Sequence, residues 1–402
     1  MKAVILAAGE GTRMRPLTRH CPKVMLPIGN KPILQHVIEK VKDAGVDHFI
    51  LIIGYQGDTI IEHFGEGERF GVEIDYVIQE ERLGTAHAIG TARALIDERF
   101  LVLNGDVMVT TAQVRTLLGR DEVAVMAALE VDDPSQFGVL EVDQGLVVKL
   151  HEKPDKPPTN LANAGIYVFE PEVFGGIDNT PLSTRDEYEI TRTIQDMIDS
   201  GIHVGYQVLS GTWQDVGRPW DLLDANMEYL KTISNDIKGE IEDDVHIHGP
   251  VMIEAGAKVR SGAYIEGPAI IGPDCDIGPN CYIRPYTSLG RGVRIGNAVE
   301  VKNSIIMDRT HVGHLSYVGD SVIGSCCNFG AGTKVANLRH DGGNIKVKIN
   351  EKIVDSGRRK LGTIMGDNVH TGINCMLNVG SVIESGSNIW PGEFVRDYYP
   401  HE

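Results

Sequence analysis

The stretch VMIEAGAKVRSGAYIEGPAIIGPDCDIGPNCYIRPYTSL, residues 251–289, places an aliphatic side chain at every sixth position. The series runs unbroken from Ile241 to Met307 and resumes after a one-residue slip at Val312, often with glycine after the aliphatic residue. A fixed six-residue period is typical of a parallel β-helix, in which each unit forms one flat face of a triangular coil and buries its aliphatic side chain. Chance spacing in an α/β domain is the alternative, and an unbroken run of this length argues against it.

One segment, residues 336–363, interrupts the repeat and carries an excess of positive charge. An insertion into a repeat array usually projects from one face of the coil. A solvated loop is the alternative, but the excess stands out in a chain whose net charge is −18, and we predict a site for a phosphate-bearing ligand. The basic residues are Arg339, Lys346, Lys348, Lys352, Arg358, Arg359 and Lys360, and only Asp341, Glu351 and Asp355 oppose them.

The first half of the chain follows a different pattern, in which short apolar runs alternate with amphipathic stretches. This alternation predicts an α/β domain whose Rossmann-like, mostly parallel sheet is covered by helices. We therefore predict two domains, 1–232 and 233–402. The expected strands are 3–8, 49–53, 73–79, 100–106, 123–131 and 203–209, and a hairpin turns at 143–145. The expected helices are 33–45, 58–64, 85–95, 186–199 and one that Pro219 opens.

Composition excludes several classes of protein. The 402 residues include 38 Lys and Arg against 56 Asp and Glu, so the chain lacks the basic footprint that nucleic-acid binding needs. No apolar run approaches the roughly 18 residues of a membrane span, and the start of the chain lacks a signal-peptide pattern. The six cysteines form no CxxC pair, which favours free thiols in a reducing compartment. We expect a cytoplasmic protein that binds neither nucleic acid nor membrane.

The first apolar run leads into a loop of small residues, LAAGEGTR at 6–13. Small side chains let backbone N–H groups approach phosphates and a nucleobase, and Arg13 and Lys23 add mobile positive charge. The loop lacks the third glycine of GxGxxG and the GK[ST] of a P-loop, so neither of those folds is expected. The residues predicted to line the nucleotide site here are Leu6, Ala7, Ala8 and Gly9.

Two aspartates follow predicted strands. Asp106 closes FLVLNGD, and Asp215 lies in WQDVG. Ligands of α/β proteins bind outside the carboxyl ends of parallel strands, and two carboxylates together with phosphate oxygens commonly hold Mg²⁺. Each aspartate alone is more often a cap or turn residue. Beside a phosphate loop, the pair predicts a magnesium site.

The segments LAAGEGTRM, PK, QEERLGTAHAIG, LNGD, EKP, NAGIYVF and WQDVG resemble the sugar-1-phosphate nucleotidylyltransferase family. The resemblance implies that a sugar-1-phosphate oxygen attacks the α-phosphate of a nucleoside triphosphate and releases pyrophosphate. It implies that Arg13 and Lys23 hold the triphosphate and that Asp106 and Asp215 hold Mg²⁺. The implied base-reading residues are Gln79, Gly84 and Thr85, and the implied sugar-phosphate residues are Gly138, Glu152, Lys153 and Asn163.

The second half resembles the acetyltransferase part of bifunctional enzymes that make N-acetylglucosamine-1-phosphate and then its UDP derivative. The resemblance rests on GHLSYVGD at 313–320 and implies a left-handed β-helix in which His314 takes a proton from the amino group that attacks acetyl-CoA. The implied acceptor-binding residues are Arg284, Lys302, Tyr317 and Asn328. Asn337, Ala331 and Lys360 are implied near acetyl-CoA, with Asn337 also within reach of the sugar.

Details of the sequence affect the expected substrates and assembly. The bacterial bifunctional enzymes tend to carry Asn where Asp215 lies, and ANLRHD and DSGRRK look more like archaeal relatives, which accept several sugar phosphates and triphosphates. UTP and dTTP therefore both remain candidate donors. β-Helix acyltransferases of this type are usually trimers, so we expect a homotrimer. The alternative is a nucleotidylyltransferase alone, with a β-helix that serves assembly or regulation.

Overall fold

In the computed structural model, which describes residues 1–401, contacts divide the chain into two units. The first comprises Met1–Glu10 and Ile33–Asp215, and the second comprises Gly11–Pro32 and Val216–Glu402. The segment Gly11–Pro32, which carries Arg13 and Lys23, thus groups with the C-terminal half although it directly follows the first strand. The predicted boundary at residue 232 stays a prediction.

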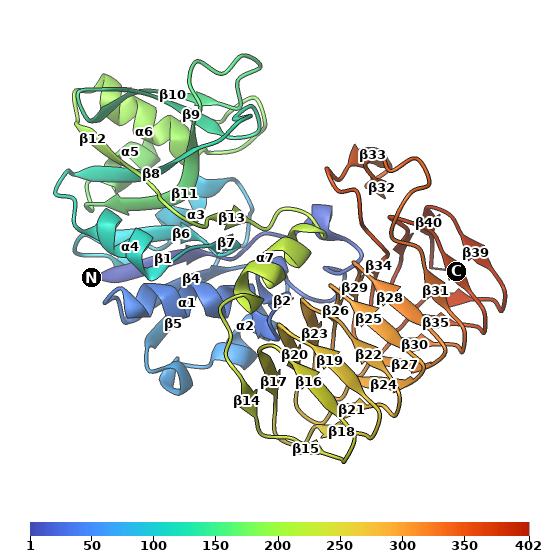
Figure 1. Ribbon diagram of the computed structural model, residues 1–402. Helices are drawn as coiled ribbons and strands as arrows, with labels where there is room; N and C mark the ends of the chain where they lie inside the picture. The colour runs from blue at the N-terminus through green and yellow to red at the C-terminus, as the bar shows by residue number, and fades with distance from the viewer. Residues whose placement is uncertain (402) are drawn as a thin grey trace. The chain divides into compact units, whose positions relative to one another are not determined.

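The first unit is built on one nine-stranded sheet (Figure 1). Its order is β5 (Glu73–Ile78), β4 (His48–Ile53), β1 (Lys2–Leu6), β6 (Phe100–Asn104), β11 (Leu161–Phe169), β8 (Ala124–Glu130), β12 (Val204–Val208), β10 (Leu146–Glu152) and β9 (Gly138–Asp143). The strands from β5 to β6 run parallel, as do β8 and β12. Strand β11 runs antiparallel to β6 and β8, and β9 and β10 form the expected hairpin. The predicted Rossmann-like α/β fold is confirmed, with β11 as a strand that the pattern did not predict.

Amphipathic helices pack on this sheet. In α1 (Ile33–Asp43), apolar residues at helical spacing are all buried. The other helices are α2 (Gly57–Phe64), α3 (Thr85–Thr91), α4 (Thr111–Leu118), α5 (Val173–Asp178) and α6 (Ile190–Asp199). The sequence reading missed α4 and α5. Helix α4 begins with a capping box. The Thr110 hydroxyl accepts the Gln113 backbone N–H, and the Gln113 side-chain oxygen accepts the Thr110 backbone N–H.

The second unit is a left-handed parallel β-helix made of three parallel sheets (Figure 1). One sheet holds β14 (Asp236–Ile237), β17 (Val251–Ile253), β20 (Ala269–Ile271), β23 (Thr287–Leu289), β26 (Ile305–Ile306), β29 (Val322–Ile323), β34 (Ile364–Met365), β37 (Val382–Ile383) and β40 (Tyr398–Tyr399). The second holds β15 (Glu240–Ile241), β18 (Lys258–Val259), β21 (Asp276–Ile277), β24 (Arg294–Asn297), β27 (His311–His314), β30 (Asn328–Phe329), β35 (His370–Thr371) and β38 (Asn388–Ile389). The third holds β16 (His246–His248), β19 (Tyr264–Glu266), β22 (Tyr282–Ile283), β25 (Glu300–Lys302), β28 (Tyr317–Gly319), β31 (Lys334–Val335), β36 (Met376–Leu377) and β39 (Phe394–Val395).

The six-residue aliphatic series forms the core of this coil. Ile253 stacks on Ile271, eighteen positions later, and the series residues are buried together in one cluster. The slip lies earlier than expected, because Leu289 stacks on Ile306 and Met307 is outside that core cluster. The series therefore shortens by one residue before Ile306 rather than after Met307.

The insertion is a folded hairpin. Strands β32 (Lys346–Ile349) and β33 (Lys352–Asp355) pair antiparallel, and an isolated bridge between Leu338 and Lys360 closes the base. Val347 and Ile349 are buried. The hairpin is therefore an ordered structure with an apolar side, not only a solvated loop.

The segment Gly11–Pro32 is attached to the β-helix at several points. Asn30 Nδ2 donates to the Leu289 carbonyl at 2.6 Å, and Arg19 Nε lies 2.9 Å from a carboxylate oxygen of Glu384. Asn350 Nδ2, at the tip of the hairpin, donates to the Thr12 carbonyl at 3.3 Å. Within this unit the segment includes the short strands β2 (Pro27–Ile28) and β3 (Lys31–Pro32), and helix α7 (Asp221–Leu230) lies against β2.

All six cysteines are free thiols, as the sequence analysis predicts. Burial raises the pKa of the Cys275, Cys281 and Cys327 thiols to about 12. Within residues 1–401, no helix has both the length and the apolar character needed to traverse a bilayer.

The stacked core generates a stability prediction. Ile283 is fully buried in the coil, whereas Ile353 in the hairpin is 75% exposed. Ile283→Ala should lower stability by about 2–5 kcal/mol because it leaves a cavity, and Ile353→Ala should change it by less than about 0.5 kcal/mol. Thermal unfolding measured by circular dichroism compares the two variants. Equal melting temperatures would contradict the stacked core.

Candidate active sites

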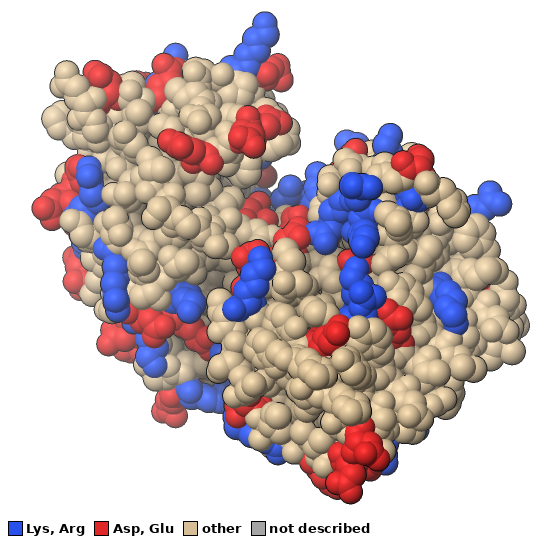
Figure 2. Space-filling view, viewed as in Figure 1, with Lys and Arg blue, Asp and Glu red and all other residues tan. Residues whose placement is uncertain are grey.

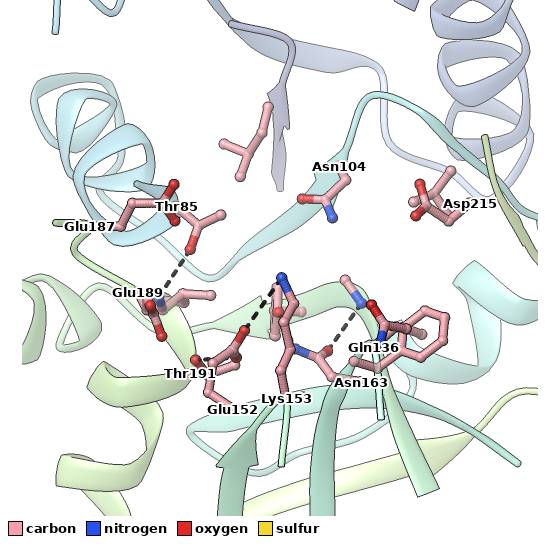
Figure 3. A pocket seen from close by; sticks show the side chains of 18 of the residues that line it. Thr85, Asn104, Gln136, Glu152, Lys153, Asn163, Glu187, Glu189, Thr191 and Asp215 are labelled. Carbon is pink, nitrogen blue, oxygen red and sulfur yellow. Dashed lines mark hydrogen bonds and ion pairs between the residues drawn. The ribbon is translucent and has the colours of Figure 1, made fainter. Parts of the chain in front are cut away.

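A cavity of about 240 Å³ opens in the first unit beside the carboxyl ends of β1 and β6 (Figure 3). All four residues predicted to bind the sugar phosphate line it, and Asp215 lies on its wall. The lining residues are Leu6, Thr85, Asn104, Val107, Gln136, Phe137, Gly138, Glu152, Lys153, Asn163, Ala164, Gly165, Tyr167, Arg185, Glu187, Glu189, Ile190, Thr191, Trp213 and Asp215. This first cavity is large enough for a small polar ligand.

A second cavity of about 360 Å³ adjoins the first, since Leu6, Thr85, Asn104 and Glu187 line both. It holds most residues of the predicted nucleotide site, together with Asp106. These residues are Leu6, Ala8, Gly9, Gln79, Gly84, Thr85 and Asp106. Ala7 is not among its lining residues, and its backbone N–H donates to the Ile52 carbonyl at 2.8 Å.

The proposed base-reading corner is held by local contacts. Gln79 is buried, and its amide nitrogen lies 3.0 Å from His87 Nδ1. Gly84 has a φ of +108°, and a Cβ at this position would lie 2.5 Å from the Tyr188 carbonyl oxygen. Thr85 Oγ1 accepts the Ile190 backbone N–H. Only glycine fits at position 84 because the chain passes so close to the backbone of residue 188.

Glu152 is the centre of a charged network in the first cavity (Figure 3). Its carboxylate accepts from Arg185 at 2.8 Å and from Thr191 Oγ1 at 3.0 Å, and Lys153 Nζ lies 3.9 Å away. Partial burial disfavours the charge of Arg185, but bonds to Glu189 and Glu152 outweigh it and raise the pKa of the guanidinium. The Glu152 carboxylate is therefore held in one position on the wall of the cavity.

Asn163 is also held in place. Its amide nitrogen donates to the Tyr167 hydroxyl at 2.7 Å, and its carbonyl accepts the Gly165 N–H at 3.0 Å. Burial raises the pKa of Tyr167, which stays a neutral phenol. Gly138 is buried opposite, and a Cβ there would meet Asn163 and Glu152 at 3.4 Å.

The two predicted metal-binding aspartates come together through a short pair of strands. Strand β13 (Gln214–Asp215) pairs antiparallel with β7 (Val107–Met108), and Asp215 lies opposite Val107, next to Asp106 in the chain. Two carboxylates at one edge fit Mg²⁺, which usually takes one or two carboxylates plus substrate phosphates. Across residues 1–401 no group of three or more His, Cys, Asp or Glu is arranged to hold a metal ion. The two aspartates together supply carboxylate oxygens of the kind that Mg²⁺ takes in proteins.

Arg13 and Lys23 lie in the second unit, on the segment that follows the small-residue loop. Lys23 is 9% exposed, and a Cβ at Gly11 would lie 2.8 Å from its Cβ, so glycine is needed for the lysine stem to pack there. Thr18 Oγ1 donates to the Gly11 carbonyl at 2.9 Å and closes this turn. Arg13 is exposed, and its side chain makes no hydrogen bond or ion pair within residues 1–401.

Of the four residues predicted to bind the acetyl acceptor, Lys302 and Tyr317 lie in the third sheet of the β-helix, Arg284 directly follows a strand of that sheet, and Asn328 lies in the second sheet. The Arg284 backbone N–H donates to the Val301 carbonyl at 2.8 Å, and Lys302 stacks on Gly319 in the next coil. Arg284 pairs with Glu300 at 2.8 Å, and this bond raises the pKa of its guanidinium. Its Nε is buried and has no hydrogen-bond partner among the described residues. A buried N–H without a partner is costly, so this donor marks a place for an anionic or polar ligand.

His314 lies at the adjacent edge of the same coil. It ends β27, is exposed, and its imidazole has no hydrogen-bond partner among residues 1–401. Its backbone carbonyl accepts the N–H of Gly332, next to Ala331, so the two share a corner of stacked coils. Asn328 lies opposite His311 in the same sheet. His314, Asn328 and Ala331 thus lie on neighbouring coils.

The basic insertion is partly neutralised. Arg339 pairs with Asp341 and Lys348 with Glu351, while Arg358 pairs with Asp224 outside the hairpin. The side chains of Lys346, Lys352 and Lys360 make no ion pair within the described chain. Figure 2 shows Lys and Arg side chains gathered around the hairpin with few carboxylates among them. The predicted positive surface is present and rests on these three lysines together with Arg359, which is exposed and whose side chain, among residues 1–401, bonds only to the Gly342 carbonyl.

Sequence reasoning missed several lining residues. Asn104 lies in the quoted LNGD, where only Asp106 was considered, and Asp320 closes the quoted GHLSYVGD. Arg185 and Glu189 come from TRDEYEI, a stretch without periodicity. The motif residues were readable from the sequence, whereas the role of Arg185 depends on a tertiary contact.

Comparisons with known proteins cover the whole chain. Residues 2–232 match the nucleotidyl transferase family, and residues 265–387 match the GMPPB C-terminal domain. The chain is 47% identical to the bifunctional protein GlmU of Methanocaldococcus jannaschii, over 98% of this chain and 93% of that protein. It is 40% identical to the bifunctional sugar-1-phosphate nucleotidylyltransferase/acetyltransferase of Sulfurisphaera tokodaii, over 98% and 97%.

A solved structure matches the first half. A protein described as a glucose-1-phosphate thymidylyltransferase from Bacillus anthracis, determined with sucrose, superposes with a TM-score of 0.53 at 31% identity. The match covers 59% of this chain and 98% of that one. The fold of the first half therefore has a counterpart in a solved structure that is described as a sugar-phosphate enzyme.

The backbone at Gly84 generates a second stability prediction. Gly84→Ala should lower the melting temperature by several degrees, because it forces a positive φ and a contact with the Tyr188 carbonyl. Gly175→Ala is the control, since a Cβ there has open space and the residue lies within helix α5. Thermal unfolding measures both variants. A Gly84→Ala protein as stable as the Gly175→Ala protein would contradict the tight approach at residue 188.

Proposed function

The chain belongs to the GlmU family of bifunctional nucleotidylyltransferases and acetyltransferases, and from this premise we propose which residues carry each reaction. The protein is a transferase that acts on nucleotide and sugar-phosphate substrates. We propose that it acetylates glucosamine-1-phosphate or a related amino sugar phosphate. We further propose uridylyl transfer from UTP to N-acetylglucosamine-1-phosphate or glucose-1-phosphate, with dTTP as the other candidate donor.

For nucleotidyl transfer, the two adjoining cavities support a division of labour. The nucleoside lies at Gln79, Gly84 and Thr85, and the sugar lies in the first cavity. An oxygen of the sugar phosphate attacks the α-phosphorus, the bond to the β-phosphate breaks, and pyrophosphate leaves. The sugar is held by Gly138, Glu152, Lys153 and Asn163.

Charge stabilisation in this reaction falls to a small set of residues. Arg13 and Lys23 hold the triphosphate, and phosphoryl transfer depends mainly on positioning and on neutralising charge. Asp106 and Asp215 would hold Mg²⁺, which would neutralise charge on the phosphate oxygens when bound. The pairing of β7 with β13 is the observation that supports this pair of aspartates.

For acetyl transfer, the exposed imidazole of His314 and the unpartnered Nε of Arg284 support the proposal together. His314 accepts a proton from the amino group as its nitrogen attacks the thioester carbonyl of acetyl-CoA. The carbon–sulfur bond then breaks, and CoA leaves as a thiolate that takes up the proton held by His314. Arg284 and Lys302 bind the sugar phosphate, and Tyr317, Asn328 and Asn337 contact the sugar.

Acetyl-CoA itself would meet Ala331, Asn337 and Lys360. The insertion hairpin supplies positive charge for the phosphates of CoA, and Lys346, Lys352 and Lys360 are the lysines without an internal partner among the described residues. Because the chain carries a net charge of −18, a polyanion such as CoA needs this local surface.

We also propose a homotrimer. The later coils of the β-helix expose several large apolar side chains, as expected of a surface that other copies cover. They are Leu315, Ile373, Met376, Trp390 and Phe394. Multi-angle light scattering should give about three times the 43.9 kDa chain mass. A mass near that of a single chain would contradict the trimer.

The proposed base can be separated from its neighbours by mutation. His314→Ala should reduce acetyl transfer about 10²–10⁴-fold, because no other group removes the amine proton. Release of free CoA and of pyrophosphate is measured on the same preparation. His311→Ala, on the same strand and equally exposed, should keep both rates. Acetyl transfer that survives in His314→Ala would exclude this base.

Metal removal distinguishes the two reactions. Chelation with EDTA should abolish pyrophosphate release and leave CoA release unchanged. Asp106→Asn and Asp215→Asn should each raise the Mg²⁺ concentration needed for half-maximal nucleotidyl transfer about tenfold or more, because each removes a carboxylate oxygen ligand. Asp143→Asn, on the hairpin between β9 and β10, serves as the control. An unchanged Mg²⁺ dependence in both site variants would rule out the metal site.

A further inference from the structure

Asp320 is a buried carboxylate that the proposed mechanism does not use. It is 3% exposed and follows β28 at a corner of the coil. Its Oδ1 accepts from Asn303 Nδ2 at 2.7 Å. Its Oδ2 accepts from Asn337 Nδ2 at 2.6 Å and lies 3.3 Å from Lys302 Nζ. Two of these three partners, Lys302 and Asn337, are residues that the acetyl transfer proposal already uses.

The bond to Asp320 fixes which way the Asn337 amide faces. Its nitrogen has two hydrogens, one directed to Asp320 and the other to the Tyr317 hydroxyl at 3.0 Å. A carboxylate only accepts hydrogen bonds, so the opposite amide orientation would set two acceptors against each other. The Asn337 carbonyl oxygen therefore remains as the polar atom for a ligand. The Tyr317 hydroxyl accepts from Asn337 and keeps its own hydrogen to donate.

The absence of a side chain at Gly319 leaves room for the Tyr317–Asn337 hydrogen bond. A Cβ at this position would lie 2.4 Å from the Tyr317 hydroxyl and 2.8 Å from Asn337 Nδ2. Any side chain larger than hydrogen would displace the Tyr317–Asn337 bond. The Gly319–Asp320 pair thus leaves room for the bond and orients it.

The carboxylate also positions charge. Burial raises the pKa of Tyr317, and the negative charge of Asp320 raises it further, so the tyrosine remains a neutral donor. The Lys302 ammonium has three hydrogens, and its contact with Asp320 leaves others for a phosphate. Other corner aspartates differ: Asp274 pairs with Arg291 at an exposed surface.

We propose that Asp320 is a positioning residue for the acetyl acceptor. It holds Asn337 so that its carbonyl accepts from an N–H or O–H of the amino sugar, it leaves Tyr317 as a donor, and it holds Lys302 for the phosphate. This inference rests on the proposed acetyl transfer. Asp320 itself touches no substrate and acts through these three side chains.

The test begins with Asp320→Asn in the full chain. The NH₂ group of the new amide can face the NH₂ group of Asn337, and the Asn337 side chain then rotates to avoid two opposed donors. Lys302 also loses the negative charge beside its ammonium group. We expect the KM for glucosamine-1-phosphate to rise tenfold or more, with smaller changes in kcat and in the KM for acetyl-CoA. Pyrophosphate release should stay within twofold. Asp308→Asn, at another corner where the carboxylate accepts a backbone N–H, should change none of these values.

A reciprocal swap separates positioning from mere stability. Asp320→Asn combined with Asn337→Asp restores a donor facing an acceptor between the two positions, but it presents a carboxylate to the acceptor. The double variant should recover the wild-type melting temperature and retain the raised KM. Recovery of both values would show that Asp320 only stabilises the corner and would overturn the proposal. An acceptor KM within twofold of wild type in Asp320→Asn would also overturn it.

Binding measurements distinguish this inference from the proposed function. Isothermal titration calorimetry with glucosamine-1-phosphate alone should show tenfold or greater weakening in Asp320→Asn. If the wild-type protein binds this ligand but releases no CoA from acetyl-CoA, the acetyl transfer proposal fails, and the same titration still decides whether Asp320 positions the site. Equal affinity in the two proteins overturns the inference whatever the activity.

Discussion

The stacking register of the β-helix is the constraint on which the second unit depends. Parallel strands lie about 4.8 Å apart, so each residue is fixed above its counterpart one coil earlier. On most faces the aliphatic residue of the series and a second residue two positions earlier fill the interior, and the residue between them can face outward, as Lys258 does between Ala257 and Val259. That register places Lys302 against Gly319 and brings Asp320 within reach of Asn303. A group of polar side chains far apart in sequence is therefore assembled by core packing.

In the first unit, the corresponding constraint is that the neighbouring parallel strands β1 and β6 end at the same edge of the sheet. Leu6 ends β1 and Asn104 ends β6, and both line the two cavities. The short pairing of β13 with β7 adds Asp215 at the same edge. The segment with Arg13 and Lys23 is held instead by the β-helix, through Leu289, Glu384 and Asn350. The residues assigned to nucleotidyl transfer therefore come from both units, since Arg13 and Lys23 belong to the second.

Much of the fold and of the two candidate sites could be predicted from the sequence, because these features depend on periodicity or on contiguous motifs. The six-residue period indicated the β-helix, and the loop at 6–13 indicated the nucleotide site. The one-residue slip was misplaced because Ile305, Ile306 and Met307 are all apolar, and only strand pairing shows which one enters the core. Helix α4 carries a readable capping box that was overlooked, whereas Arg185 lies in an aperiodic stretch and reaches Glu152 only through the fold. Asp320 was visible in the motif, but its burial and its partners were not.

In this proposal, one chain carries two reactions on separate sets of residues. The most direct test supplies one preparation with UTP and N-acetylglucosamine-1-phosphate in one assay, and with acetyl-CoA and glucosamine-1-phosphate in the other. Pyrophosphate is measured in the first and free CoA thiol in the second. We expect pyrophosphate in the first assay and free CoA in the second, each formed without the substrates of the other reaction. Pyrophosphate without any CoA release, across a panel of amino sugar phosphates, would contradict it and leave the β-helix without a catalytic role.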